Sequence, residues 1–188
     1  MNNFITRSQI SLTAKYNVKS ASRNSSLLMA IIKKALGNQS TYLTSVFLSH
    51  SHNDSELIED IISILTKLNI SVYVDWLDNN LTYPPSAKTA IHIKEAIKKN
   101  QKFILIASNG AINSKWCNWE LGLGDSEKYL NNIALFPIAD DTGLWLGNEY
   151  LQIYPYIDKS YKSLEFSDEY IVHYPDGKKI NLIQWLNQ

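Results

Sequence analysis

The segment that decides the fold is Ser114-Lys115-Trp116-Cys117-Asn118-Trp119-Glu120-Leu121-Gly122-Leu123. Read as a helix capped by Ser114, it places four side chains on one stripe with the spacing of a buried face: Trp116, Trp119, Glu120 and Leu123. Glu120 then lies among aromatic neighbours on an apolar face. Burying an ionised carboxylate is costly unless the group gains a partner or its pKa rises. We therefore expect Glu120 to be there for a chemical reason.

Outward from this helix, strand patterns and helix patterns alternate along the chain. Four segments have the apolar, β-branched character of buried strands: residues 44–49, 70–76, 102–108 and 133–138. Apolar residues recur at helical spacing over 57–68, and a second helix is predicted over 87–99. This alternation predicts an α/β fold with a central parallel sheet of about five strands and helices on both faces.

Polar residues follow the first three of these strands at the point where each strand ends. Ser49 and His50 close the first strand, Asp75 the second and Ser108 the third. The carboxyl ends of parallel strands meet at one edge of such a sheet, and ligands bind beyond that edge. The helix that carries Glu120 starts from the same edge, so we expect these side chains to surround one site.

The chain is less regular before this core. Residues 1–44 are rich in Ser, Asn, Lys and Thr, and they are predicted to be a polar leader with one short helix, Ser26–Leu36. A regulatory or oligomerising arm is the alternative interpretation. Residues 45–188 are predicted to form one domain that includes an irregular C-terminal segment.

Within that C-terminal segment, Tyr150–Tyr154 is a candidate fifth strand. Glu169–Lys179 is predicted to be a strand that leads into a turn at Asp176-Gly177. A short closing helix is then expected over residues 182–186, where apolar side chains gather again.

The composition argues against several classes of protein. Lys and Arg together number 18, as do Asp and Glu, so no excess of charge favours nucleic acid or an anionic membrane. The single cysteine cannot form an internal disulfide, which fits a reducing compartment. No apolar run is long enough to cross a membrane, and no secretory signal is recognisable. We expect a soluble cytoplasmic protein.

Three motifs in order resemble a bacterial, stand-alone Toll/interleukin-1 receptor (TIR) domain, from Ser45 to near Pro155. Val46-Phe47-Leu48-Ser49-His50-Ser51-His52-Asn53-Asp54 is similar to the first strand and loop of the family, and Val72-Tyr73-Val74-Asp75 to its second strand. Ser114–Leu121 is similar to its signature helix. The resemblance implies a flavodoxin-like fold. It also implies self-association through the BB loop, here residues 77–88, although Pro84-Pro85 departs from the usual loop.

Enzymatic members of the family cleave NAD+ at the nicotinamide–ribose bond, and the resemblance implies that Glu120 is their catalytic glutamate. Short members in Thoeris-type antiphage systems turn NAD+ into a cyclic or modified ADP-ribose signal that activates a separate effector protein. The resemblance therefore implies an NAD+ glycohydrolase or ADP-ribosyl cyclase in immune signalling. NAD+ is then a substrate and no cofactor is required; the sequence has no GxGxxG or Walker motif. The alternative is a non-catalytic TIR module that acts by self-association or TIR–TIR binding.

Each candidate substrate-binding residue also has a structural interpretation. Trp116 lies one turn before the candidate catalytic residue, where it would stack on a ring of the dinucleotide or fill core. Phe47, Ser49 and His50 would shape the adenine and ribose pocket; core packing and helix capping are the alternatives. Asp75 would bind a ribose hydroxyl or cap the following loop.

Other reactive residues are given structural roles. Cys117 stands beside a tryptophan and at no recognisable spacing from a histidine, so we expect it to be buried packing. His50 and His52 are two residues apart and no cysteine pair completes a zinc set, so we predict no metal. Gly122 and Gly124 within a helix indicate close approach by a ligand or a neighbouring element, or early fraying.

Overall fold

The structure is a computed structural model of the chain, and it describes residues 4–18, 44–66, 68, 70–75, 86–160 and 169–188. Within these residues, seven strands form one sheet in the order β2-β1-β3-β4-β5-β6-β7. Five neighbouring strands pair in parallel: β1 (Thr44–Ser49), β2 (Ile70–Tyr73), β3 (Lys102–Ser108), β4 (Ile133–Ile138) and β5 (Tyr156–Ser160). Two antiparallel strands extend the sheet: β6 (Glu169–His173) and β7 (Lys179–Asn181). The predicted parallel sheet is confirmed.

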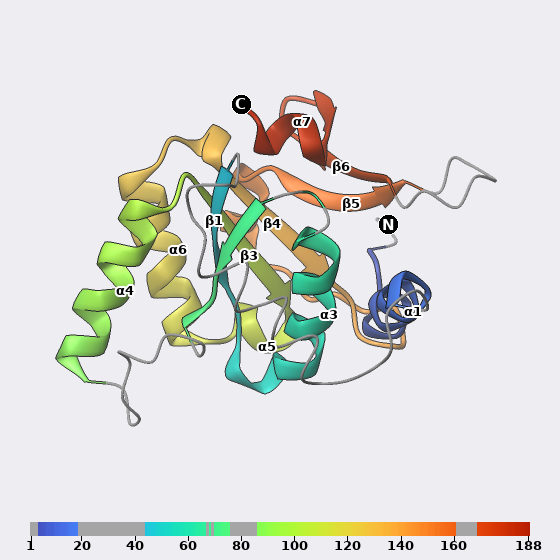
Figure 1. Ribbon diagram of the computed structural model, residues 1–188, viewed down its shortest axis with the longest axis horizontal. Helices are drawn as coiled ribbons and strands as arrows, with labels where there is room; N and C mark the ends of the chain where they lie inside the picture. The colour runs from blue at the N-terminus through green and yellow to red at the C-terminus, as the bar shows by residue number, and fades with distance from the viewer. Residues whose placement is uncertain (1–3, 19–43, 67, 69, 76–85, 161–168) are drawn as a thin grey trace.

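Helices cover both faces of this sheet (Figure 1). On one face lie α1 (Arg7–Val18), α3 (Ser55–Thr66) and the short α7 (Leu182–Leu186). On the other face lie α4 (Ala87–Lys99) and α6 (Lys115–Glu127), which pack side by side, together with α5 (Asn109–Ile112). Three 3-10 turns complete the described elements: η2 (His52–Asp54), η4 (Leu130–Asn132) and η5 (Glu149–Ile153). This layered arrangement is the predicted α/β fold.

Side chains alternate along the parallel strands and divide the core between the two faces. In β3, Ile104 and Ile106 pack on the side of α3, whereas Phe103 and Leu105 pack on the side of α4 and α6. Every residue of β3 is buried, as expected of a central parallel strand whose two faces are both covered.

The N-terminal residues contain a helix that the sequence pattern did not indicate. α1 packs on α3: Ile10 is fully buried in the shared core, and the Ser11 hydroxyl donates to Asp60 of α3 at 2.7 Å. Before α1, Thr6 forms a parallel bridge with Ala139, which follows β4. The predicted helix Ser26–Leu36 lies outside the described residues, and the domain boundary at residue 44 stays a prediction.

The predicted strand at Tyr150–Tyr154 is wrong. Residues 150–153 belong to the 3-10 turn η5 and Tyr154 follows it, and the fifth strand is β5, directly after Pro155. The reason is the spacing of the buried side chains: Leu151 and Tyr154 are buried three residues apart, which fits one turn of a 3-10 helix and not the alternation of a strand.

The end of the chain follows the prediction closely. β6 and β7 are joined by the expected turn, in which Gly177 has a φ of 88°. That left-handed conformation favours glycine. The closing helix is α7, whose Trp185 is fully buried.

Candidate active site

Helix α6 presents Glu120 to the sheet. The Ser114 hydroxyl caps the helix by accepting the backbone N–H of Cys117 at 3.3 Å, as predicted. The buried positions of α6 are Cys117, Glu120, Leu121 and Gly124. The buried face is therefore shifted by one residue from the predicted stripe. Glu120 is the one residue that belongs to both the predicted and the observed face.

The two tryptophans pack against each other, and Trp116 also packs against the core on this side of the sheet. Their ring centroids lie 5.0 Å apart, Trp119 is 37% exposed and Trp116 is half-buried. Trp119 is therefore a partly exposed residue and not part of the buried face of α6.

Helix α6 lies close to β3 at Gly124, one of the buried positions of the helix. A Cβ atom at Gly124 would come within 3.1 Å of the Phe103 ring, whereas one at Gly122 would meet nothing within 4 Å. Of the explanations offered for these glycines, close approach of a neighbouring element thus holds at Gly124.

Glu120 is 2% exposed, and its Oε2 accepts a hydrogen bond of 2.5 Å from the Ser49 hydroxyl. Since Ser49 is the last residue of β1, this bond joins the carboxyl edge of the sheet to α6. Burial raises the pKa of Glu120 to about 8; the Ser49 hydrogen bond opposes the rise, the charge of Asp75 adds to it, and a hydrogen bond from Trp116 opposes it. Near neutral pH this carboxyl can therefore change its charge, a property typical of functional sites.

A second buried pair lies beside it. Nε2 of His50 is 3.6 Å from Oδ1 of Asp75, and Nδ1 of His50 is 3.2 Å from the backbone oxygen of Leu48. Burial lowers the pKa of His50, and the charge of Asp75 opposes that change. The structure thus brings four predicted residues to one edge of the sheet: Ser49, His50, Asp75 and Glu120.

Phe47, in contrast to these four, is part of the hydrophobic core. It is 1% exposed, and its ring stacks between Tyr73 and Phe103 at centroid distances of 5.4 Å and 5.5 Å. This is the core packing that was the structural alternative for Phe47. Its contribution to a substrate pocket stays a prediction, as does stacking by Trp116.

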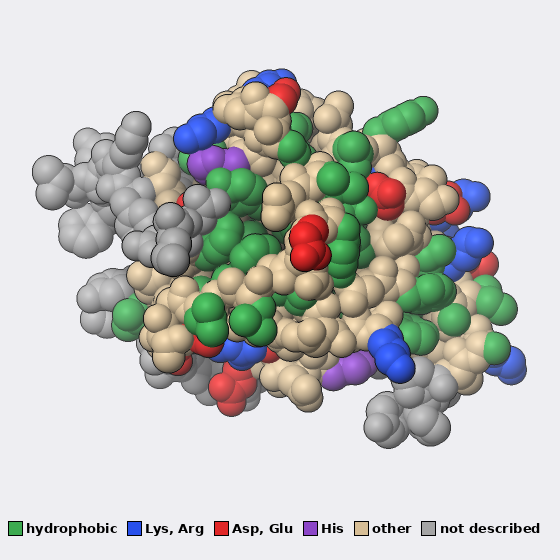
Figure 2. Space-filling model, turned by 180° about the vertical axis from the view of Figure 1, so that it is seen from behind, with side chains coloured by type: hydrophobic (Ala, Val, Ile, Leu, Met, Phe, Trp, Pro, Cys, Tyr) green, Lys and Arg blue, Asp and Glu red, His purple; other side chains and the backbone are tan. Residues whose placement is uncertain are grey.

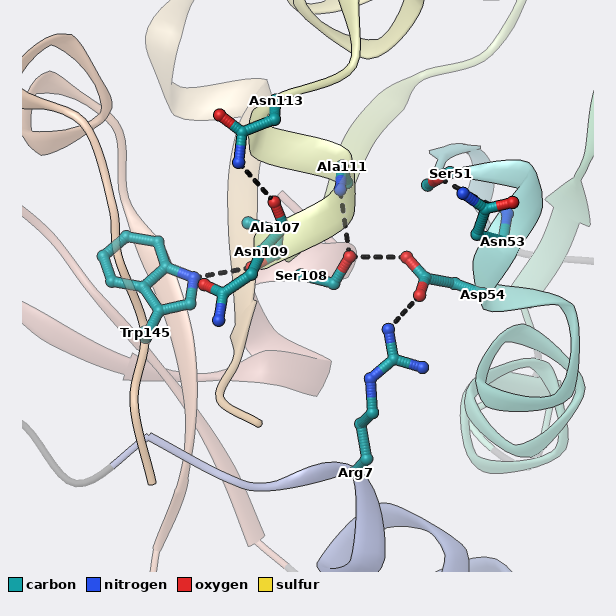
Figure 3. Close-up of polar contacts among 10 residues, drawn as sticks. All are labelled: Arg7, Ser51, Asn53, Asp54, Ala107, Ser108, Asn109, Ala111, Asn113 and Trp145. Carbon is teal, nitrogen blue, oxygen red and sulfur yellow. Dashed lines mark hydrogen bonds and ion pairs between the residues drawn. The ribbon is translucent and has the colours of Figure 1, made fainter. Parts of the chain in front are cut away.

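One buried carboxylate at this edge was not predicted as a site residue. Asp54, 1% exposed, accepts a hydrogen bond from the Ser108 hydroxyl and forms an ion pair with Arg7 (Figure 3). Ser108 also caps α5 by accepting the backbone N–H of Ala111 at 3.0 Å. Asp54 therefore ties together α1, the end of β3 and the loop after β1. The sequence marked Ser108 at a strand end, but no local pattern links Asp54 to Arg7.

Cys117 has the packing role expected of it. It is 1% exposed, and burial raises the pKa of its thiol to about 11, so the reactive thiolate is scarce at neutral pH. Within the described ranges, no three His, Cys, Asp or Glu side chains are grouped as metal ligands would be. The predicted independence from metal stays a prediction.

A family model described as "TIR domain" matches residues 46–170. The chain belongs to the TIR-domain family. The match spans most of the chain and includes all three motifs from which the resemblance was inferred. In this TIR domain the signature helix is α6, and the first motif is β1 with its following loop.

Two named proteins are similar to this TIR domain. "Probable 3' cyclic ADP-D-ribose synthase ThsB'" of Bacillus cereus (strain MSX-D12) is 30% identical over 149 residues, which are 76% of this chain and 75% of that protein. "Putative cyclic ADP-D-ribose synthase TIR2" of Cytobacillus dafuensis is 27% identical over 135 residues, which are 63% of this chain and 35% of that protein. Both are named for synthesis of cyclic ADP-ribose.

The surface of the TIR domain carries both signs of charge. Figure 2 shows basic and acidic side chains interspersed over one face, without a large field of one sign. Among the described helices, none combines the length and the apolar character that a membrane crossing requires.

Proposed function

We propose that this TIR domain cleaves NAD+ at the nicotinamide–ribose bond and forms nicotinamide with ADP-ribose or a cyclic ADP-ribose isomer. Family membership and the names of the two relatives support this activity. The observation that carries it is the Glu120 carboxyl, buried on the signature helix and held by Ser49 at the edge where ligands bind in such sheets.

The proposed reaction needs one carboxylate. Breaking the bond sends its electron pair to the nicotinamide nitrogen and leaves positive charge on C1′ and the ring oxygen of the ribose, as in glycoside hydrolysis. Nicotinamide is cationic in NAD+ and departs neutral, so it takes no proton. Ionised Glu120 stabilises the positive ribose. Water, or an oxygen or nitrogen of the same ADP-ribose unit, then attacks C1′ and gives up a proton if it carries one.

The substrate itself favours the reactive form of Glu120. In the free protein, burial raises the pKa of Glu120 to about 8, so the protonated form predominates at neutral pH. A pyridinium cation placed beside this carboxyl stabilises the ionised form and lowers its pKa. Binding of NAD+ thus charges the group that the bond cleavage requires. The residues that we assign to substrate binding are Phe47, Ser49, His50, Asp75 and Trp116.

We further propose that the active form is an assembly and that its product activates a separate effector protein in the cytoplasm, as part of antiphage defence. This proposal rests on the resemblance to Thoeris-type proteins. Of the loop assigned to self-association, residues 77–85 lie outside the described residues, and Ser86 caps α4. Specific activity should rise with protein concentration; a constant value across a wide dilution range contradicts assembly.

Nicotinamide release from NAD+ tests the activity. Glu120→Gln keeps the shape of the side chain and should abolish release, whereas Glu127→Gln, at an exposed position of the same helix, should leave it unchanged. Mass spectrometry of the products separates hydrolysis from cyclisation. If wild type and Glu120→Gln release nicotinamide equally slowly at high concentration, the enzyme proposal fails and a non-catalytic TIR module remains.

A further inference from the structure

A cavity of about 620 Å³ opens at the amino ends of the parallel strands. Its walls come from the start of β1, the start of β3, the turn η4 and the end of α7. The lining residues are Thr44, Gln101, Lys102, Asn132, Leu186, Asn187 and Gln188. Its volume lies within the range of small-molecule sites in proteins.

The cavity is remote from the candidate active site. Thr44 and Ser49 are the first and last residues of β1, so about 16 Å of strand separates the cavity from the Ser49–Glu120 hydrogen bond. The two sites lie at opposite ends of the parallel strands, and no described residue belongs to both.

Among the described residues of the cavity wall, Lys102 is the one with a charged side chain. The residue is 2% exposed, and its ammonium donates to Oδ1 of Asn132 at 2.7 Å. The ammonium also lies 4.8 Å from the ring centroid of Trp185, a cation–π contact. Within the part of the chain that the structure describes, Lys102 forms no ion pair.

A buried cation without a carboxylate is costly. Burial lowers the pKa of Lys102, which reflects that cost. Proteins normally pair such charges, because neutral partners compensate only part of the lost hydration. Lysine has three donors, and the amide oxygen and the indole face are both neutral partners. An anion in the cavity would supply the missing opposite charge.

The other lining residues suit a polar ligand of this kind. Four side-chain amides, from Gln101, Asn132, Asn187 and Gln188, border the cavity and offer both donors and acceptors. Among the described residues that line the cavity, none has an acidic side chain that would repel an anion. We infer that this cavity is a second ligand site, which binds a small metabolite through a phosphate or carboxylate group held by Lys102.

The Trp185 indole reports on this site. Its N–H donates to the backbone oxygen of Asn131 at 2.9 Å, so it should give a distinct resonance in an amide-proton NMR spectrum. Trp185→Phe identifies that resonance among those of the five tryptophans. Inorganic phosphate and acetate are titrated separately against chloride at equal ionic strength. The test variants are Lys102→Met and Lys102→Arg. The matched control is Lys98→Met, at an exposed position of α4.

We expect the Trp185 signal of wild type to shift and saturate with at least one of the two anions. Lys102→Met should weaken binding by about tenfold or more, since a charge-assisted bond is lost. Lys98→Met should bind like wild type, and Lys102→Arg should retain binding if Lys102→Met does not fold. Saturation by phosphate alone assigns a phosphorylated ligand, and saturation by acetate a carboxylate. A signal that neither anion moves, or that moves equally in Lys102→Met and wild type, overturns the inference.

Discussion

Replacing Glu120 by glutamine should stabilise the protein by an amount that grows with pH. Burial raises the pKa of Glu120 to about 8 in the folded protein, from an ordinary value of 4.5. Between these two values the unfolded chain is ionised at this position while the folded protein holds the proton. Wild type therefore loses stability as pH rises through this window, because folding has to take up a proton from solution. Glutamine does not ionise, so the stability of the variant does not have this pH dependence.

The size of the effect follows from the same interval. Each pH unit inside the window is worth about 1.4 kcal/mol. Between pH 5 and pH 7, the difference in free energy of unfolding between Glu120→Gln and wild type should therefore grow by about 3 kcal/mol in favour of the variant. The difference between the unfolded and folded pKa values limits this gain in stability to roughly 5 kcal/mol, which is reached above pH 8. The side-chain carbonyl of glutamine still accepts the Ser49 hydrogen bond, so packing is largely retained.

Urea unfolding at pH 5, 6, 7 and 8 measures this difference directly. Glu127→Gln, exposed on the same helix, should follow wild type at every pH. A stability difference between Glu120→Gln and wild type that is constant over this range would refute the reasoning, because it would mean that folding does not retain the proton on Glu120. The measurement needs no substrate, so it tests the electrostatics of the site independently of the proposed activity.

Three other predictions use different readouts. Gly122→Ala should stabilise the protein by up to about 1 kcal/mol in urea unfolding, because its Cβ meets nothing within 4 Å, whereas Gly124→Ala should gain less or lose stability against the Phe103 ring. Equal gains would contradict the close packing of α6. Arg7→Met and Asp54→Asn should show a coupling of about 1 kcal/mol or more in a double-mutant cycle, and additive effects would contradict the ion pair. The kcat/KM for NAD+ should rise nearly tenfold per pH unit below about 8, because burial raises the pKa of the Glu120 carboxyl to that value and the ionised form is the reactive one; a flat profile from pH 6 to 8 would contradict this.

The parallel core could be predicted from the sequence because its signals are local. β3 is a continuous apolar run, and α4 has a helical apolar period, so both were placed correctly. α1 lacks such a signal, and its contacts are distant: Arg7 meets Asp54 47 residues away, and Ser11 meets Asp60 49 residues away. No single-segment pattern contains that information.

The face of α6 shows a different limit of sequence reasoning. Because tryptophan is counted as apolar when helical periodicity is assessed, the predicted buried face was placed on the side of Trp116 and Trp119. The observed buried face instead includes Gly124, where a Cβ atom would come within 3.1 Å of the Phe103 ring of β3. The distance between α6 and the sheet is a property of the tertiary structure, so the pattern of one segment does not reveal which side of α6 faces inward.

Two carboxyl groups buried at one edge of the sheet, Asp54 and Glu120, differ in the partners that they have. Asp54 has a cationic partner in Arg7 and a hydroxyl donor in Ser108, so its charge is compensated and it holds three segments together. Glu120 has no cationic partner among the described residues; it accepts from Ser49, and the charge of Asp75 helps to raise its pKa. A carboxyl left in this state destabilises the folded protein above its ordinary titration range. In the proposed reaction, the cationic nicotinamide ring of NAD+ supplies the missing opposite charge, so binding of the substrate relieves the penalty at Glu120.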